Sequence, residues 1–232
     1  MRSHRRLLSA VALAGVAVFA LAGCRTSPTV AAYVGDTQIT ESQVSDIYDA
    51  TVKEAPKTPL TRQDVVQALV LGELCGQLQS AKKFSSQQID TASIAQSLGV
   101  TQGAPAVKMF DKTYSCLSGF PASSTPLTAE QKQEVLQAAI ADGIFPPGST
   151  VASVGDQIDT AQVRGAMAER DAFAQAATDV SVNPRYRQLT FPILQGQSGK
   201  PIIYVPLGQA PNGAVTDGPG EAPSAAPIEP QS

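Results

Sequence analysis

The side chains that could do chemistry in this chain are three cysteines, Cys24, Cys75 and Cys116, and a single histidine, His4. Histidine is the usual base that activates a serine or cysteine nucleophile, and it is a frequent zinc ligand. Because His4 lies near the amino terminus in a secretion-signal-like segment, no histidine remains downstream for such a site. We find no glycine-rich phosphate-binding motif either. The sequence therefore predicts a protein that is not an enzyme and that needs no metal or other cofactor.

Residues 1–23 have the form of a signal peptide, because three arginines precede an apolar run at 7–21. That run has 15 residues, whereas a membrane-spanning helix needs about 20. It leads into L-A-G-C at 21–24, which resembles the bacterial lipobox. The resemblance implies lipid attachment at Cys24 and a lipid-anchored protein on the extracytoplasmic face of the cell membrane. The alternatives are an uncleaved anchor and an ordinary cleavage site that includes a cysteine.

Once Cys24 carries lipid, Cys75 and Cys116 remain as an even pair in an oxidising compartment. Such a pair predicts a disulfide bond. Closing the loop of about 40 residues between them would stabilise the fold by about 4 kcal/mol on the chain-entropy model. The alternative is two buried free thiols, since cysteine also packs as a small apolar residue.

The charge of the mature chain argues against nucleic acid as a partner. Without the three arginines of the leader, the 17 basic residues become 14 against 20 acidic ones, which gives a formal charge of −6. The chain has no tryptophan and no basic run that could follow a phosphate backbone.

The composition divides the chain into four parts. Residues 1–23 are the signal peptide and 24–29 a short tether. Residues 30–207 are expected to form one folded domain. Residues 208–232 are rich in proline, glycine and alanine, and they have too few large apolar side chains to offset the entropy of ordering. We expect this tail to be disordered.

The helical period dominates the predicted domain. A spacing of 3.6 between apolar residues predicts helices at 40–54, 61–84, 86–98, 104–118, 128–143 and 160–178. Several of these helices begin with a capping box, in which a hydroxyl side chain and the side chain three residues later bind each other's backbone. Thr40 with Gln43, Thr61 with Asp64, and Thr128 with Gln131 fit this pattern.

Two segments resemble each other, V-G-D-T-Q-I-T at 34–40 and V-G-D-Q-I-D at 154–159. Both follow a short strand-like run, at 30–34 and 151–154, and in both the Gly-Asp pair suits a tight turn. We expect strand, turn, isoleucine, cap and helix in each, with Asp159 as the second cap. A true duplication and a shared capping rule both remain open.

The last part of the domain has strand-forming composition. Residues 189–194 and 201–205 flank the sequence Q-G-Q-S-G, which predicts a β-hairpin. Three prolines in or beside these strands favour positions at a sheet edge.

The segment 30–54, with its pattern V-A-x-x-V-G-D-x-x-I-T-x-S-x-V, resembles the opening of the SurA N-terminal domain family. Asn183-Pro184-Arg185-Tyr186 resembles the exit from the helical domain in lipoproteins of this group. The resemblance implies a mainly α domain with a small β-sheet formed by short strands near both ends, and a last helix that packs on the first ones. It also implies an extracytoplasmic folding factor. The parvulin isomerase domain of many relatives is not expected, since its site uses histidines.

An apolar stripe at 104–118 is the candidate client-binding surface. Its residues are Val107, Met109, Phe110, Tyr114 and Leu117. Such a stripe could line a groove for unfolded segments. The alternative is that it belongs to the core, as amphipathic helices normally bury their apolar face.

The function expected from these observations is that of a membrane-anchored, non-catalytic, chaperone-like module that binds unfolded or secreted proteins. An alternative is a structural lipoprotein that docks on a specific envelope protein. A third hypothesis, a lipid or small-ligand carrier, requires a sizeable internal cavity.

Overall fold

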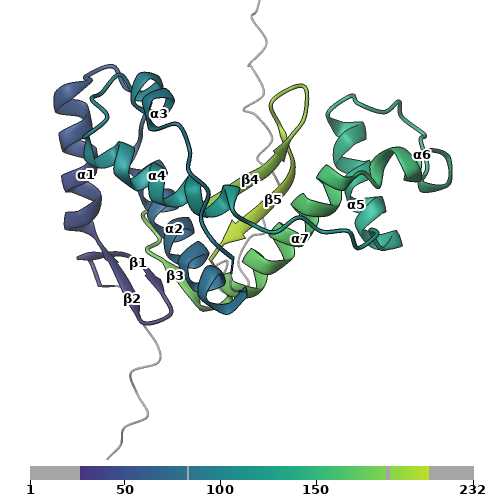
Figure 1. Cartoon of the computed structure of the whole chain (residues 1–232), viewed down its shortest axis with the longest axis horizontal. Coiled ribbons are helices and arrows are strands. Elements are labelled where there is room, and N and C mark those ends of the chain that lie inside the picture. The colour runs from purple at the N-terminus through teal and green to yellow at the C-terminus, as the bar shows by residue number, and fades with distance from the viewer. Residues whose placement is uncertain (1–26, 83, 187–188, 209–232) are drawn as a thin grey trace, which may run out of the picture.

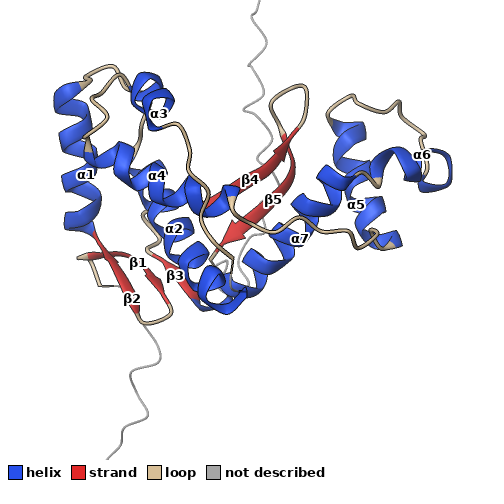
Figure 2. Ribbon diagram, viewed as in Figure 1, coloured by secondary structure: helices blue, strands red, loops and turns tan. Residues whose placement is uncertain are grey.

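A computed structural model describes residues 27–82, 84–186 and 189–208. The predicted signal peptide, Cys24 and the predicted tail from residue 209 onward lie outside the described residues. The described part is mainly α, with seven α-helices and two small antiparallel sheets (Figure 1, Figure 2). This confirms the predicted fold class.

The elements of the described chain follow one another in this order: β1 (Val30–Val34), β2 (Thr37–Thr40), α1 (Glu41–Glu54), α2 (Arg62–Lys82), α3 (Thr91–Leu98), α4 (Pro105–Ser118), α5 (Ala129–Ala141), α6 (Val151–Ile158), α7 (Ala161–Ala176), a 3-10 turn (Ala177–Asp179), β3 (Val180–Val182), β4 (Leu189–Gln195) and β5 (Pro201–Leu207).

The first sheet joins segments from near both ends of the described chain. Its strand order is β2-β1-β3, and β1 runs antiparallel to both neighbours. Gly35 has a φ of 57°, so it supplies the left-handed conformation that the turn between β1 and β2 requires. On the other side Val34 lies opposite Val180, which follows α7. The expected pairing of strands from the two ends is thus confirmed.

Three helices begin with the capping boxes that the sequence predicted. Thr40 and Gln43 cap α1, and Thr128 and Gln131 cap α5, each with both reciprocal hydrogen bonds. At α2 the backbone N–H of Thr61 donates to Asp64 at 2.8 Å, and the N–H of Asp64 donates to the hydroxyl of Thr61 at 3.2 Å. Local chemistry therefore determines where these helices start.

The segment 151–158 corrects the sequence prediction, because it forms helix α6 and not a strand with a turn. Thr150 and Ser153 make a capping box, and Val151, Val154 and Ile158 have helical spacing and pack together in one core. Gly155 lies inside the helix, so the likeness between the two V-G-D segments does not extend to their structure.

Two helix starts also differ from the prediction. Thr160 caps α7 through its hydroxyl, which accepts from the N–H of Val163 at 3.3 Å. The expected cap, Asp159, instead binds two cations, as described below. Helix α3 starts at Thr91, later than the predicted residue 86, because Asp90 caps it by accepting from the N–H of Ala92 at 3.0 Å.

The buried apolar side chains form two clusters, and α7 and the β4–β5 hairpin contribute to both. The larger cluster, which we call core 1, joins the first sheet with α1 to α4 and contains Phe173 of α7. The smaller one, core 2, joins α5 and α6 and contains Met167 of α7. Figure 1 shows α5 and α6 on one side of α7 and the hairpin, and α1 to α4 on the other. The last helix thus packs against α2, as expected.

The predicted hairpin is formed by β4 and β5, which pair with each other alone among the described strands. Its turn is held by Asp142 at the end of α5. The carboxylate accepts from the backbone N–H of Gln197 at 2.7 Å and also binds the hydroxyl of Ser198. These hydrogen bonds tie core 2 to the tip of the hairpin.

The segment Asn183 to Tyr186 fastens the exit of the domain to its entry. Asn183 donates through its side-chain amide to the carbonyl of Val30 at 3.0 Å. The hydroxyl of Tyr186 donates to Glu41 at 2.7 Å, and Arg185 lies 3.4 Å from the same carboxylate. Burial, and then the hydrogen bond to Glu41, raise the pKa of Tyr186 to about 12. The phenol therefore stays protonated and remains a donor at neutral pH.

Candidate functional site

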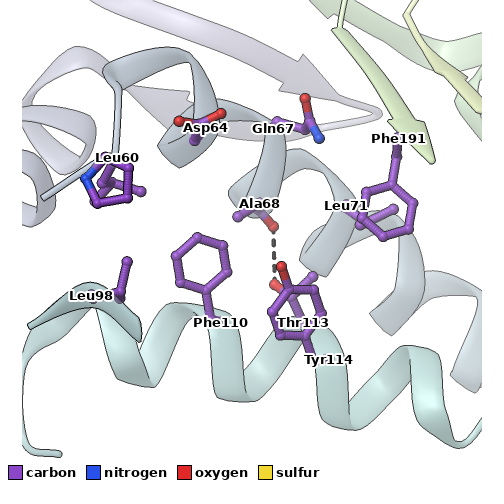
Figure 3. Close-up of a pocket in the computed structure, with 11 residues that line it drawn as sticks. Leu60, Asp64, Gln67, Ala68, Leu71, Leu98, Phe110, Thr113, Tyr114 and Phe191 are labelled. Carbon is purple, nitrogen blue, oxygen red and sulfur yellow. Dashed lines mark hydrogen bonds between the residues drawn. The ribbon is translucent and has the colours of Figure 1, made fainter. Parts of the chain in front are cut away.

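An open groove lies between α2 and α4, and we call it the α2–α4 groove. Its volume is about 280 Å³. Figure 3 shows α2 as one wall and α4 as the other. The lining residues are Pro59, Leu60, Asp64, Gln67, Ala68, Leu71, Leu98, Phe110, Thr113, Tyr114 and Phe191.

The α4 wall of the groove carries two stacked aromatic rings. The ring centroids of Phe110 and Tyr114 are 5.5 Å apart and their planes differ by 14°. They are four residues apart on one helix, which brings side chains onto the same face. Tyr114 is 38% exposed, whereas the large apolar side chains of the core are buried. The pair therefore offers an aromatic surface that no described side chain fully covers.

The walls of the groove are held close together by small residues and one buried hydroxyl. Thr113 donates toward the carbonyl oxygens of Ala68 and Met109, each 3.0 Å from its Oγ1. A Cβ on Gly72 would come within 2.8 Å of that oxygen. Helices α2 and α4 can approach this closely only because position 72 has no side chain.

Cys75 and Cys116 join the same two helices. Their Cα atoms are 6.1 Å apart, within the range that a disulfide requires, and both side chains are buried. Cys116 follows Tyr114 by two residues, and Cys75 lies one turn beyond Leu71 of the groove. The predicted pair is therefore at bonding distance and sits where it would fix the spacing of the groove walls.

The structure divides the candidate client-binding residues. Phe110 and Tyr114 line the groove, so they remain candidates for client binding. The prediction is wrong for Val107 and Met109, which are 1% and 7% exposed and belong to core 1. Leu117 is partly buried against the same core. A helix turns 100° per residue, so one apolar stripe of α4 is shared between the core and the groove.

The other apolar lining residues were not expected from the sequence. Leu60 precedes the cap of α2, Leu98 ends α3, and Phe191 comes from β4. Each could equally have been assigned to the core, because nothing in the sequence near it distinguishes a groove position from a core position. Only the packing of three separate segments around α4 brings these residues together.

A second, shallower hollow adjoins the groove, because Pro59 and Leu98 line both. Its volume is about 420 Å³, and it is lined by the loop after α1 and by the end of α3. Lys57 lies in this second hollow. The two hollows therefore lie next to each other on the surface.

Asp64 is the one charged residue among those that line the α2–α4 groove. Burial raises the pKa of Tyr114 above its usual range, and the nearby charge of Asp64 raises it further. The tyrosine therefore stays protonated at neutral pH, while Asp64 contributes a negative charge.

Asp159 and Glu169 are carboxylates outside the groove, and their pKa values are shifted in opposite directions. Asp159 lies 2.6 Å from Arg164 and 3.0 Å from Lys132, and these contacts lower its pKa to about 2. Glu169 of α7 has no partner among the described residues, and burial raises its pKa to about 7. Neither residue lies in the groove.

The described residues contain no group of three or more histidine, cysteine, aspartate or glutamate side chains that could hold a metal ion. One Ser-x-x-Lys spacing, from Ser80 to Lys83, occurs in the sequence. Ser80 donates to the carbonyl of Gly76 at 3.1 Å, which is an ordinary bond within a helix, and Lys83 lies outside the described residues.

Within the described part of the chain, no helix is both long and apolar enough to cross a bilayer. Comparisons with protein families, with curated proteins and with solved structures found no match.

Proposed function

We propose that this chain is a lipoprotein, anchored through Cys24 on the extracytoplasmic face of the membrane, that binds apolar segments of unfolded or secreted proteins without catalysis. The likeness of residues 30–54 to the SurA N-terminal domain family supports a role in protein folding outside the cytoplasm. The lipobox-like sequence at 21–24 supports the anchor.

The observation that carries this proposal is the α2–α4 groove with its stacked Phe110 and Tyr114. Aromatic side chains bind apolar groups over a large area with few rotatable bonds, so little conformational entropy is lost. The groove is close to the lower end of the range of about 300 to 1,000 Å³ typical of ligand sites. It therefore suits one large apolar side chain of an extended segment.

Such a site fits transient binding of many segments. One buried side chain contributes about 1.5 to 3 kcal/mol, from which the ordering of the segment must be subtracted. The adjoining hollow would add contacts to the backbone of the bound segment. Weak binding of this kind slows aggregation and still allows release.

The test uses the mature chain, Cys24 to Ser232, with Cys24→Ser to avoid lipid attachment, since this chain keeps every described element. Aggregation of heat-denatured citrate synthase is followed by light scattering at equimolar and higher ratios. We expect suppression by this chain and loss of most of the suppression by the double variant Phe110→Ser/Tyr114→Ser.

The matched control is Tyr204→Ser, because Tyr204 is 45% exposed on β5 and lines neither hollow. It should leave suppression unchanged. Circular dichroism of every variant checks that it is folded. No suppression by the parent chain, or equal suppression by the groove variant, would count against the proposal.

The small volume of the groove also suits a single anchor residue of one folded partner, which is the alternative function. In that case the parent chain would not suppress aggregation. It would instead form a complex of fixed stoichiometry with one envelope protein, and Phe110→Ser/Tyr114→Ser would abolish that complex.

A further inference from the structure

We propose that the α2–α4 groove selects segments in which a lysine or arginine stands two residues from the apolar anchor, because Asp64 and the aromatic pair together favour a cation. This proposal rests on the proposed function, since it names the class of polypeptide that the same groove would bind.

The carboxylate of Asp64 has a free acceptor. Its Oδ2 accepts from the backbone N–H and from the hydroxyl of Thr61, at 2.8 and 2.7 Å. Its Oδ1 accepts no hydrogen bond from the described residues, and no described cation pairs with the carboxylate. A donor carried by a ligand can therefore bind Asp64 without displacing the bonds that cap α2.

Two basic residues in this region, Arg62 and Lys57, form no ion pair with Asp64. Arg62 stands two residues earlier, but it binds Asp49 at 2.9 Å and Ser45 at 2.7 Å, and it lies 4.8 Å from the ring centre of Tyr48. Lys57 lines the adjoining hollow and is not among the residues that line the groove. The groove therefore has, at its α2 wall, a negative charge that pairs with no cationic side chain among the described residues.

The wall opposite Asp64, which belongs to α4, also favours a positively charged ligand. The faces of aromatic rings attract a cation placed within about 6 Å of the ring centre. The rings of Phe110 and Tyr114 lie on α4, across the groove from Asp64, with their nearly parallel faces along the groove (Figure 3). A cation at the mouth of the filled groove, near Asp64 and above the face of one of these rings, would thus be attracted by both.

The geometry of an extended chain specifies where that cation should stand. Successive side chains of a strand point to opposite faces, so residues two apart point the same way and lie about 6.5 Å apart. If the anchor fills the groove, the side chain two positions away returns to the same surface. A formal charge of −6 on the mature chain also favours the approach of cationic segments.

The experiment compares two capped nonapeptides of glycine and serine that differ at one position. Both contain phenylalanine, followed two residues later by lysine in one and by glutamate in the other. Dissociation constants come from amide chemical-shift titrations of the mature chain with Cys24→Ser at low ionic strength. We expect the lysine peptide to bind about three- to fivefold more tightly, the upper range for an exposed ion pair.

Two variants test whether Asp64 is the cause. Asp64→Asn keeps an acceptor for the cap of α2 and should remove the preference between the peptides. Asp46→Asn removes the same charge from an exposed position on α1 that does not line the groove, and should keep the preference.

Equal binding of the two peptides by the parent chain would overturn the proposed selectivity and leave the proposed function standing. Unchanged binding of the lysine peptide by Phe110→Ser/Tyr114→Ser would show charge attraction outside the groove, and would overturn both. Failure of both peptides to bind, together with no suppression of aggregation, would likewise count against both.

Discussion

At the scale of single residues, several acidic side chains stabilise the fold through hydrogen bonds and ion pairs. Asp142 accepts a hydrogen bond from the turn of the hairpin, and Glu41 accepts one from the hydroxyl of Tyr186. Asp159 forms ion pairs with Arg164 and Lys132. Asp90 and Asp64 cap helices. These are short-range hydrogen-bonding roles, which suit carboxylates at turns and helix starts.

Glu169 is different, and it predicts an unusual dependence of stability on pH. Burial raises its pKa to about 7, so between about pH 4.5 and 7 the folded chain holds a proton that the unfolded chain has released. The free energy of unfolding must therefore fall as pH rises through this window. We expect Glu169→Gln to be more stable than the parent at pH 8, by about 3 kcal/mol at most.

The measurement is urea unfolding of Glu169→Gln and of the parent chain at several pH values from 4 to 8. Their difference should vanish at the acid end, where the glutamate is protonated in both states. Asp46→Asn, at an exposed position on α1, is the control and should show no such rise. A difference that is independent of pH would contradict the prediction.

At the scale of elements, the groove lies where α2 and α4 pack closely together, and Gly72 permits this close approach. Gly72→Ala would place a Cβ within 2.8 Å of Thr113 Oγ1. We expect a loss of about 1 to 3 kcal/mol in the free energy of unfolding, although alanine is the better helix former.

Gly76→Ala on the same helix is the matched control for Gly72→Ala. A Cβ at position 76 would meet nothing within 4 Å, so this change should be neutral or should stabilise by about 1 kcal/mol. The double variant Gly72→Ala/Thr113→Ala should lose less than the sum of the single changes in urea unfolding. Additive losses would show that the two residues do not press on each other.

The link between Cys75 and Cys116 is a second prediction for these elements. Peptide mapping without reductant should recover the two cysteines in one cross-linked fragment. Replacing both by alanine should lower the free energy of unfolding by about 2 to 4 kcal/mol, because the unfolded chain gains a free loop and the core loses packing. Free thiols that react with an alkylating reagent in the folded, oxidised chain would refute the pairing.

Prolines in the β4–β5 hairpin limit the pairing of its edges with further strands. Pro192 lies opposite Tyr204, and Pro206 lies opposite Thr190. Proline has no N–H to donate, so these positions offer few donors to an incoming strand. Binding through the groove is therefore better supported than addition of a strand to this sheet.

At the scale of the whole molecule, two cores share one helix and one hairpin. Met167 is buried in core 2, and Phe173 of the same helix is buried in core 1. Core residues of β5 divide in the same way, since Ile203 belongs to core 2 and Val205 to core 1. Because both cores pack against the continuous helix α7, we expect the loss of packing in one core to weaken the other.

We therefore expect Met167→Ala to destabilise both cores together, by about 2 to 5 kcal/mol. Amide hydrogen exchange in moderate urea, followed by mass spectrometry, measures each segment separately. Exchange should quicken to a similar extent in α2 and in α5. Faster exchange confined to α5 and α6 would show instead that core 2 opens independently of core 1.

The sequence by itself predicted the features that depend on near neighbours in the chain. The helical period located six of the seven described α-helices, and hydroxyl residues followed by Gln43, Asp64 and Gln131 marked three of their starts. Residues 151–158 were the exception, because a short apolar run has no length to distinguish a strand from a helix.

Tertiary structure alone decided which apolar residues of α4 line the groove and which are buried. Val107 and Phe110 lie three positions apart on α4 and are equally apolar, yet one is in core 1 and the other lines the groove. That choice depends on where α2, α3 and β4 pack around α4. Burial is a property of the assembled surfaces, and no single helix carries the information about which of its faces another element will cover.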